Sequence, residues 1–214
     1  MKYRKLVENA KKPNGFWGKM MIKSMNKGHS SLTLWGLEHM NIKRTATVLD
    51  IGCGGGKTVD RLCSIVANGK VYGIDYSELS VKSSEKLNSK NILCNKAKIL
   101  QASVSDMPFD DNTFDNITAV ETYYFWPNKE NDVKEVFRVL KQGGMVMLLF
   151  EMLRTDDDPF KWEKVENMLN IKSVTPQEIR AVLESAGFEN INTYTKEGTT
   201  WLCATAQKPK DDEN

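Results

Sequence analysis

The chain has 214 residues, a length that fits one well-buried domain and leaves little room for a second. Its hydrophobic fraction of 40% and charged fraction of 27% are typical of a soluble globular protein, and no stretch reaches the roughly 18 apolar residues of a membrane span. The net charge of +2 at pH 7, without a basic stripe among aromatic residues, predicts no nucleic-acid partner.

The four cysteines contain no Cys-x-x-Cys pair, and with only two histidines they predict that the chain binds no metal. We expect small, mostly buried thiols in a reducing cytoplasm. Residues 1–5 are basic but precede no apolar run, so a cytoplasmic protein without a secretory signal is expected. No pattern in the sequence specifies an oligomeric state.

The predicted elements begin after residues 16–39, a segment rich in methionine and aromatic residues. Beyond it, short apolar runs alternate with helical spacings. The predicted strands are 47–51, 70–74, 98–102, 114–120 and 145–150, and the predicted helices are 57–67, 78–87 and 133–140. This alternation predicts a doubly wound α/β fold, in which helices cover both faces of a mostly parallel, Rossmann-like sheet.

The C-terminal part is predicted to contain one more helix and a hairpin. Thr175 is a typical cap residue, Pro176 suits a first turn, and Glu178 stands at the capping-box position. Two strand-like runs follow at 191–195 and 200–206, and a Lys-Glu-Gly turn joins them. They predict an antiparallel hairpin at the end of the sheet.

These patterns divide the chain into three parts. We expect an N-terminal helical extension at 1–44 and a single folded domain at 45–208. The charged residues 209–214 have nothing to bury, so we expect them to form a disordered tail.

The first predicted strand runs into a glycine-rich loop, DIGCGGG at residues 50–56. Gly52, Gly54 and Gly56 allow a sharp turn and a close approach to a ligand, because glycine has no Cβ. The next helix presents free N–H groups to an anion. Asp75 ends the second predicted strand and is placed to accept hydrogen bonds from both hydroxyls of a ribose. Because open α/β sheets bind ligands at the carboxyl ends of their strands, a nucleoside-type cofactor is predicted.

The spacing of the loop separates the classes of cofactor. A dinucleotide fingerprint that starts at Gly52 needs a glycine where Lys57 stands, and a Walker-type loop needs one where Ile51 stands. The carboxylate of Asp50, just before the first glycine, does not favour a pyrophosphate. It favours a cofactor that carries an ammonium and a sulfonium group.

Four segments resemble motifs of the class I S-adenosylmethionine (SAM)-dependent methyltransferases. Residues 48–56 (VLDIGCGGG) resemble the first motif, and residues 72–77 (YGIDYS) resemble the second, whose acid holds the ribose. Residues 107–115 (MPFDDNTFD) and 135–144 (EVFRVLKQGG) are similar to segments of the small-molecule, methyltransferase type 11 or UbiE-like branch. All four occur in the family's order and spacing, so the resemblance covers about residues 45–206.

The resemblance implies an enzyme that transfers a methyl group from SAM to a small-molecule acceptor and releases S-adenosylhomocysteine. The residues expected to bind the cofactor are Asp50, Gly52, Cys53, Gly54, Gly56, Asp75, Tyr76, Ser103, Val104 and Glu121. The chain departs from the family at 102–104, where Ala-Ser-Val replaces the usual Gly-Asp-Ala. We therefore expect the backbone near Ser103 and Val104 to hold the adenine, and Tyr76 to stack on it.

The acceptor is expected beside residues 121–126 (ETYYFW), which follow the fourth predicted strand. They lack the Asn-Pro-Pro-Tyr or Asp-Pro-Pro-Tyr signature of amino-directed DNA methylases, which argues against base methylation. At least one of Tyr123, Tyr124 and Trp126 is expected to line the acceptor pocket, and packing under the next helix is the alternative. Glu121 is a candidate cofactor contact or base, and a solvated acid is the alternative.

In this family the residues before the first strand often form a helical lid over the active site, so a lid is expected at 16–39. Packing on the sheet edge and a helix on a membrane surface are the alternatives. His29, in this segment, is a candidate general base or contact for the cofactor carboxylate. His29, Tyr123 and Glu121 are the candidate catalytic residues.

Two other functions stay open beside small-molecule methylation. One is a non-catalytic protein that binds SAM or S-adenosylhomocysteine, and the other is an enzyme that methylates a macromolecule. The intact motifs and the aromatic residues at 121–126 favour catalysis, and the lack of a basic extension weighs against a macromolecule. Methyl transfer is an in-line displacement, so the protein chiefly aligns the reactants and excludes water.

Overall fold

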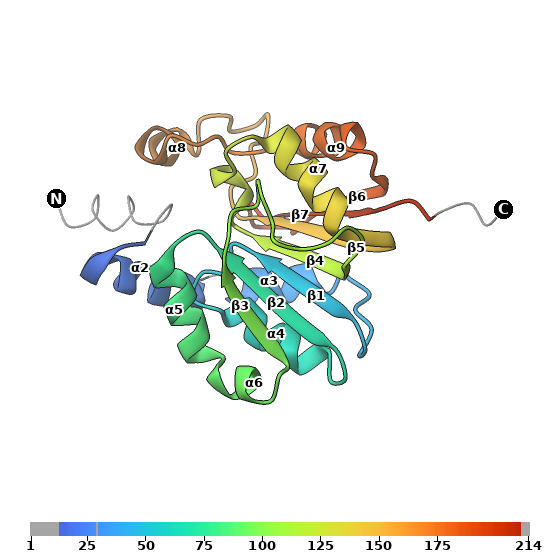
Figure 1. The fold of residues 1–214 in the computed structure, drawn as a ribbon. Helices are drawn as coiled ribbons and strands as arrows, with labels where there is room; N and C mark the ends of the chain where they lie inside the picture. The colour runs from blue at the N-terminus through green and yellow to red at the C-terminus, as the bar shows by residue number, and fades with distance from the viewer. Residues whose placement is uncertain (1–12, 29, 211–214) are drawn as a thin grey trace.

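A seven-stranded sheet lies at the centre of residues 13–28 and 30–210, the part of the chain that the computed structural model describes (Figure 1). The strands are β1 (Thr47–Ile51), β2 (Lys70–Asp75), β3 (Ala97–Gln101), β4 (Phe114–Val120), β5 (Leu140–Phe150), β6 (Glu189–Thr195) and β7 (Leu202–Gln207). Their order is β3-β2-β1-β4-β5-β7-β6. β1 to β5 are parallel, and β7 is antiparallel to both β5 and β6. The predicted doubly wound sheet with a C-terminal hairpin is therefore confirmed.

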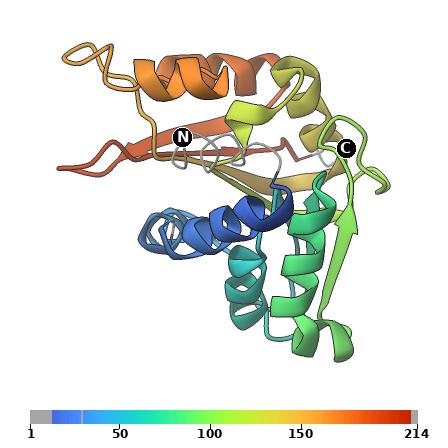
Figure 2. The ribbon, with the colours of Figure 1, turned by 90° about the vertical axis from the view of Figure 1, so that its left-hand side faces the viewer.

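Helices cover both faces of this sheet (Figures 1 and 2). One face carries α2 (Gly15–Gly28), α3 (Ser30–Leu37), α4 (Lys57–Ile65), α5 (Glu78–Leu87) and α6 (Ser89–Leu93). The other carries α7 (Lys129–Val139), α8 (Glu163–Leu169) and α9 (Pro176–Ser185), and the short 3-10 helix η1 (Tyr123–Phe125) follows β4. Because both faces are covered, the central strands are apolar on both sides.

The order of the strands reverses between β1 and β4, which lie side by side. Leu49 and Ile51 of β1 and Ile117 and Ala119 of β4 are at most 2% exposed, so this pair of strands is part of the core. β2 and β3 extend the sheet on one side of the pair, and β5 continues it on the other. The carboxyl ends of β1, β2 and β4 thus meet at a switch point, where α/β folds bind their ligands.

Capping residues determine where several helices begin. The Ser77 hydroxyl accepts the N–H of Ser80 (3.4 Å) at the start of α5. α9 opens with the predicted capping box, in which the side chains of Thr175 and Glu178 each accept the backbone N–H of the other. α4 begins instead after Gly56, a left-handed residue without a side-chain cap. The first turn of α4 therefore presents N–H groups that no cap satisfies.

The boundary between α7 and β5 differs from the prediction of a helix at 133–140 and a strand at 145–150. Asn128 starts α7 earlier, because its side chain accepts the N–H of Asn131 (3.2 Å). Leu140 is already extended, with ψ of 135°, and pairs with Phe114 of β4. The glycines at 143–144 therefore lie within β5, where the pairing with β4 is irregular, and do not precede the strand. α6 and α8 were not predicted, and neither contains a fully buried residue that would produce an apolar periodicity.

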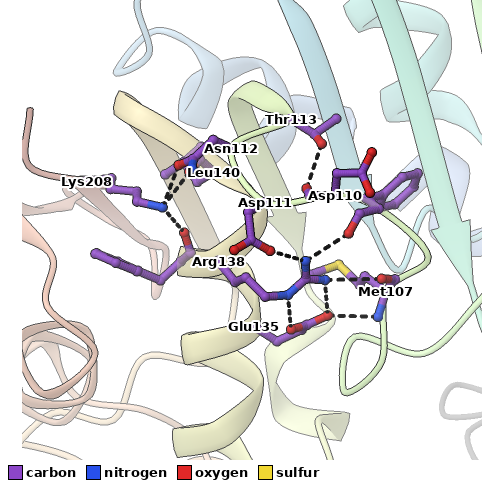
Figure 3. A network of polar contacts seen from close by, with 11 residues as sticks. Met107, Asp110, Asp111, Asn112, Thr113, Glu135, Arg138, Leu140 and Lys208 are labelled. Carbon is purple, nitrogen blue, oxygen red and sulfur yellow. Dashed lines mark hydrogen bonds and ion pairs between the residues drawn. The ribbon is translucent and has the colours of Figure 1, made fainter.

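Two of the family-like segments bind each other (Figure 3). Arg138 of α7 donates to the carbonyl oxygen of Phe109 (2.8 Å) and to the carboxylate of Asp111 (2.7 Å). It also pairs with Glu135 (2.7 Å), whose carboxylate accepts the N–H of Met107 (2.9 Å). The hydrogen bond from Arg138 lowers the pKa of Glu135. These contacts fasten the loop after β3 to α7, so both family-like segments stabilise the fold.

A buried lysine joins the end of the folded domain to α7. The Lys208 ammonium donates to the side chain of Asn112 and to the carbonyl oxygens of Phe137 and Leu140, at 2.8–2.9 Å (Figure 3). Three bonds satisfy all three ammonium donors, which offsets the cost of burial. Residues 211–214 of the expected tail lie outside the described residues.

The N-terminal segment packs on the core. α2 contacts α5, and α3 contacts β5. A Cβ on Gly18 would lie 2.8 Å from the backbone of Pro13 and 2.9 Å from Leu79, so glycine allows the close approach of α2 to α5. Residues 1–12 and His29 lie outside the described residues. Within the described part, no helix has the length and apolar character needed to cross a membrane.

Candidate active site

A cavity lies at the carboxyl ends of β1, β2 and β4, at the switch point of the sheet. Asp50 and residues 52–55 line it from β1, Asp75 and Tyr76 from β2, and residues 120–122 from β4. α2 and α3 of the N-terminal segment add a further wall. Seven of the ten residues expected to bind the cofactor therefore meet here, although they come from three strands.

Left-handed glycines shape the loop after β1. Gly52, Gly54 and Gly56 have φ of 68°, 51° and 81°, a region that other residues rarely adopt. A Cβ on Gly52 would lie 2.3 Å from the Thr122 hydroxyl, and one on Gly56 would lie 2.4 Å from the Ser84 hydroxyl. A Cβ on Gly54 would meet only a carbonyl oxygen at 4.0 Å among the described residues. Gly52 and Gly56 thus serve the packing of the protein, whereas Gly54 leaves open space at the cavity wall.

Asp75 is held at the cavity by the loop itself. One carboxylate oxygen accepts the N–H of Gly54 (3.0 Å), and the other accepts the N–H of Ser77 (2.8 Å). Each oxygen retains lone pairs for further donors such as the hydroxyls of a ribose. Burial raises the pKa of Asp75 above its usual value. The neighbouring Tyr76 is 36% exposed, which leaves part of its surface available for a flat ring.

Asp50 is the most deeply buried acid of the cavity, with 2% exposure. The Thr118 hydroxyl donates to it (2.7 Å), which favours the charged form. Burial outweighs this bond, and with the nearby charge of Asp75 it raises the pKa of Asp50 to about 7. A cationic group beside Asp50 would restore its charge and reduce the cost of its burial.

Glu121 adopts a left-handed backbone conformation with φ of 58°, which is uncommon outside glycine and asparagine. Its carboxylate accepts the backbone N–H of Glu151 and a hydrogen bond from the Tyr124 hydroxyl. Burial is the main cause that raises the pKa of Glu121 to about 8. Glu121 lies at the cavity wall, where the Glu151 N–H and the Tyr124 hydroxyl hold its carboxylate in place.

The comparisons with known proteins agree with this geometry. A family model described as a methyltransferase domain matches residues 49–148. The uncharacterized methyltransferase YdaC of Bacillus subtilis is 27% identical over 85% of this chain and 93% of its own length. The ubiquinone/menaquinone biosynthesis C-methyltransferase UbiE of Cronobacter sakazakii is 30% identical over 73% of this chain and 72% of its own. This chain belongs to the class I SAM-dependent methyltransferases.

The architecture of this methyltransferase is also that of solved relatives. A SAM-dependent methyltransferase from Aquifex aeolicus superposes with a TM-score of 0.68 at 21% identity, over 88% of this chain and 97% of that one. An identity this low shows the shared fold alone. The chain spans less than half the length of the fungal sterol 24-C-methyltransferases that it also matches. The cofactor predicted from the glycine loop, SAM, is confirmed by the family.

The residues of the cavity fit SAM chemically. Asp50 and Asp75 are buried acids, and burial raises the pKa of each. SAM carries an ammonium and a sulfonium group, and a positive charge beside these acids would favour their charged forms. Its ribose offers a diol to Asp75, and Gly54 leaves the space that such a ligand needs.

Two cations at the wall of the cofactor cavity were missed by the sequence reasoning. Lys57 and Arg61 lie one turn apart on α4, and both line the cavity of the methyltransferase. Lys57 pairs with Asp60 (2.7 Å), and Arg61 donates to the Ser30 hydroxyl of α3. Their i, i+4 spacing directly after the glycine loop was the signal in the sequence, because it places both on one face of the predicted helix.

Cys53, in the glycine loop, also lines the cavity, and its thiol is buried. It is 6% exposed, and its thiol donates a long hydrogen bond to the Ser84 hydroxyl (3.8 Å). Burial and the charges of Asp50 and Asp75 raise the pKa of the thiol well above its usual value. A thiol that resists ionisation is a poor nucleophile, so Cys53 has the character of the small, buried thiols that the sequence predicts.

The aromatic residues after β4 separate into two groups. Tyr123 and Trp126 are 4% and 6% exposed and pack on each other, and Tyr123 also packs on Phe150. Neither belongs to the wall of the cofactor cavity, and the catalytic role of Tyr123 stays a prediction. Phe125, which was not singled out, lines the cavity instead.

Three expected contacts lie away from the cofactor cavity or outside the described residues. The backbone of Ser103 forms a bridge with Asp106, and Val104 is 7% exposed in the core. Neither belongs to the cavity wall, so their contact with adenine stays a prediction. His29 lies outside the described residues, and its role as a base or carboxylate contact stays a prediction as well.

Proposed function

We propose that this methyltransferase acts on a small-molecule acceptor, with SAM bound in the cavity at the ends of β1, β2 and β4. The observation that carries the proposal is the pair of buried acids, Asp50 and Asp75, around the open space at Gly54. Relatives add support, since they include a C-methyltransferase of ubiquinone/menaquinone biosynthesis and a sterol 24-C-methyltransferase.

The charges of the cavity suggest how the cofactor is oriented. Asp75 holds the ribose hydroxyls, and Tyr76 stacks on the adenine. Asp50 faces the positive end of the methionine part, and Arg61 of α4 binds its carboxylate. SAM supplies an electrophilic methyl group and a neutral sulfide as leaving group. The protein aligns the acceptor with that methyl group, which contributes through proximity and orientation.

The N-terminal segment covers the bound cofactor in this proposal. Pro13, Ile22 of α2 and Thr33 of α3 belong to the cavity wall, and the Ser77 hydroxyl donates to the carbonyl oxygen of Pro13 (3.0 Å). Such a cover excludes water from the reacting groups. In limited proteolysis of the full chain, saturating SAM should slow cleavage within 13–37. An unchanged cleavage rate would contradict the cover.

The proposed function is tested by binding and by transfer of label. Calorimetry should show a SAM complex that Asp75→Ala weakens at least 100-fold, because two hydrogen bonds to a charged acceptor contribute about 3–6 kcal/mol. Asp157→Ala, at an exposed acid between β5 and α8, is the matched control. Radiolabelled methyl groups should then appear in small products from a metabolite panel. Label found only in protein or RNA would contradict a small acceptor.

A further inference from the structure

A second cavity of about 220 Å³ adjoins the cofactor cavity, and Glu121 and Phe125 belong to the walls of both. Its other walls come from α2, from the residues after β5 and from the region of α8. Because the two cavities share wall residues, a molecule in the second one lies next to the bound methyl donor. A cavity of roughly 150 Å³ is enough to bind benzene, so the second cavity has room for one substituted ring.

Most of the wall of the second cavity is apolar. α2 contributes Met21, the stretch after β5 contributes Met152, and the region of α8 contributes Trp162, Val165, Leu169 and Ile171. None of these six residues belongs to the described wall of the cofactor cavity. The indole N–H of Trp162 is already bonded to the carbonyl oxygen of Leu153 (3.0 Å), so its ring adds apolar surface. Such a wall favours the body of an uncharged ring, because burying a charge against apolar side chains is costly.

The polar groups of the second cavity gather at its junction with the cofactor cavity. Glu121, which both cavities share, accepts the backbone N–H of Glu151 and a hydrogen bond from the Tyr124 hydroxyl. Glu151 and Tyr124 also belong to the wall of the second cavity, and Tyr124 accepts the N–H of Met152 (3.0 Å). The second cavity therefore combines a polar end beside the methyl donor with an apolar body.

A hydroxyl group fits the polar end of the cavity in either protonation state of Glu121. The pKa of about 8 leaves Glu121 mostly uncharged at pH 7 and mostly charged once the pH exceeds that value. An uncharged carboxyl group donates one hydrogen bond, whereas a carboxylate only accepts. A hydroxyl both donates and accepts, so it pairs with both forms. An ammonium group only donates and a carboxylate ligand only accepts, so each of them pairs well with one form alone.

We infer that the second cavity binds a compact ring alcohol, a phenol or a cyclic alcohol, and that its hydroxyl oxygen at Glu121 receives the methyl group. The inference rests on the proposed function and names the acceptor class of the same site. The ring fills the apolar body of the cavity, and the hydroxyl lies at the polar end, where the methyl donor is close.

In its charged form Glu121 is the proton acceptor of this reaction. The Glu151 N–H and the Tyr124 hydroxyl hold its carboxylate at the junction of the two cavities. Its left-handed backbone conformation, with φ of 58°, costs energy and is of the kind that clusters at functional sites. A base with a pKa near the working pH combines an available carboxylate with useful basicity.

The reaction balances with these groups. The hydroxyl transfers its proton to the Glu121 carboxylate, and a lone pair of its oxygen forms the new O–C bond with the methyl carbon. The C–S bond breaks at the same time, and its electron pair stays on sulfur. The product leaves as an uncharged methyl ether, and Glu121 returns its proton to water.

Matched ring compounds test the class of substrate. The full chain with labelled SAM should convert 4-methylphenol or cyclohexanol to its methyl ether, and it should leave benzylamine and benzoate unmodified. In the complex with S-adenosylhomocysteine, calorimetry should show that 4-methylphenol binds at least tenfold more tightly than benzylamine, benzoate or toluene. If SAM binds but ring alcohols stay inert, or gain the methyl group on carbon, the inference is wrong and the proposed function stands. If SAM does not bind, the proposed function itself fails.

Substitution of Glu121 tests its role as the proton acceptor. Glu121→Gln should lower kcat for the ring alcohol by roughly 100-fold or more and change the affinity for SAM less than threefold. In the wild type kcat should rise with pH towards a plateau above about 8, and the variant should lose this rise. Glu151 and Tyr124 are the titratable groups beside Glu121, and both remain in the variant. Glu163→Gln, at an exposed acid of α8, is the matched control and should match the wild type. Equal kcat in Glu121→Gln and the wild type would overturn the assignment of the proton acceptor.

A filled cavity tests where the ring binds. Val165→Phe places a larger side chain in the wall that α8 contributes, so KM for 4-methylphenol should rise at least tenfold while the affinity for SAM stays within twofold. Asn167→Phe, at an exposed position of the same helix, is the matched control. Thermal unfolding of both variants separates a change in the cavity from a change in stability. An unchanged KM in a folded Val165→Phe variant would show that the ring does not bind in the second cavity.

Discussion

The cofactor cavity and the second cavity draw their walls from the chain in different ways. Much of the cofactor cavity comes from one stretch, residues 50–61, joined by the residues that end β2 and β4. The second cavity combines Met21, residues 121–125, residues 151–152 and residues 162–171, which are far apart in the sequence. A site built from one loop leaves a motif in the sequence, whereas a site built from distant segments leaves none.

The difference also concerns what each part of the chain contributes. In the cofactor cavity the backbone contributes much of the binding surface, through left-handed glycines and the uncapped first turn of α4. In the second cavity side chains of many types form the wall. Changes at the first site are therefore expected to alter SAM binding alone, and changes at the second to alter use of the acceptor. Four predictions test this separation.

The largest effect is expected at Gly54. Gly54→Val places a branched side chain in the open space at the cavity wall and should abolish measurable SAM binding in calorimetry. The left-handed φ of 51° adds strain of roughly 1–2 kcal/mol. Gly198→Val is a matched control, because Gly198 has φ of 71° and nothing within 4 Å among the described residues. Thermal unfolding should show similar destabilisation of both variants, and SAM binding that survives in Gly54→Val would contradict the prediction.

The second effect is a pH dependence from Asp50, whose pKa of about 7 lies above its unfolded value of 3.8. Between these values the folded apo protein binds more protons than the unfolded chain, so its stability should fall as pH rises from 4 to 7. SAM needs the charged form of Asp50, so its affinity should rise by up to about tenfold per unit over the same range. Calorimetry and thermal unfolding across this range measure both trends.

Two variants separate Asp50 from the other acids. Asp50→Asn should flatten the pH dependence of SAM affinity below pH 7. Thr118→Val removes the hydrogen bond that favours the charged form, so it should shift the profile to higher pH. Affinity that stays constant from pH 5 to pH 7 in the wild type would show that Asp50 does not contact the cationic end of SAM.

A smaller effect is expected at Arg61. Arg61→Gln should raise KM for SAM about tenfold, since one charge-assisted bond contributes about 1.5–3 kcal/mol and water partly replaces it. The value of kcat should stay within twofold, because Arg61 is placed at the cofactor and not at the acceptor. Arg44→Gln, at an exposed arginine before β1, is the control. An unchanged KM in steady-state kinetics would remove Arg61 from the proposed site.

The smallest effect on the affinity for SAM is expected from a substitution in the wall of the second cavity. Leu169→Ala shortens a side chain of α8 in the wall and so enlarges the second cavity. The KM for the acceptor should therefore rise several-fold, while the affinity for SAM stays within twofold. Asn167→Ala, at an exposed position of the same helix, controls for changes in helix stability. A loss of SAM affinity in Leu169→Ala would show that the two cavities are not separable.

The fold could be predicted from the sequence wherever apolar patterning and turn residues agreed. The parallel strands, the capping box at Thr175 and the final hairpin followed from such local signals. The start of β5 at Leu140 did not, because its extended conformation depends on pairing with Phe114, 26 positions earlier in the chain. The loop from 107 to 111 resembled a family segment in the sequence, and only its bonds to Arg138 showed its role in the fold.

The identity of the methyl donor was determined by the sequence itself. The left-handed glycines and Asp50 lie at the end of β1, and Asp75 ends β2. Because they belong to two neighbouring segments of the chain, their spacing forms a motif that can be read in the sequence. Only the tertiary structure brought Glu121 beside Glu151, placed Phe125 at the cavity wall, and moved Tyr123 into the core. The physical reason is that an acceptor pocket depends on side chains that meet across α2, β4, β5 and α8, and no spacing along the chain records those contacts.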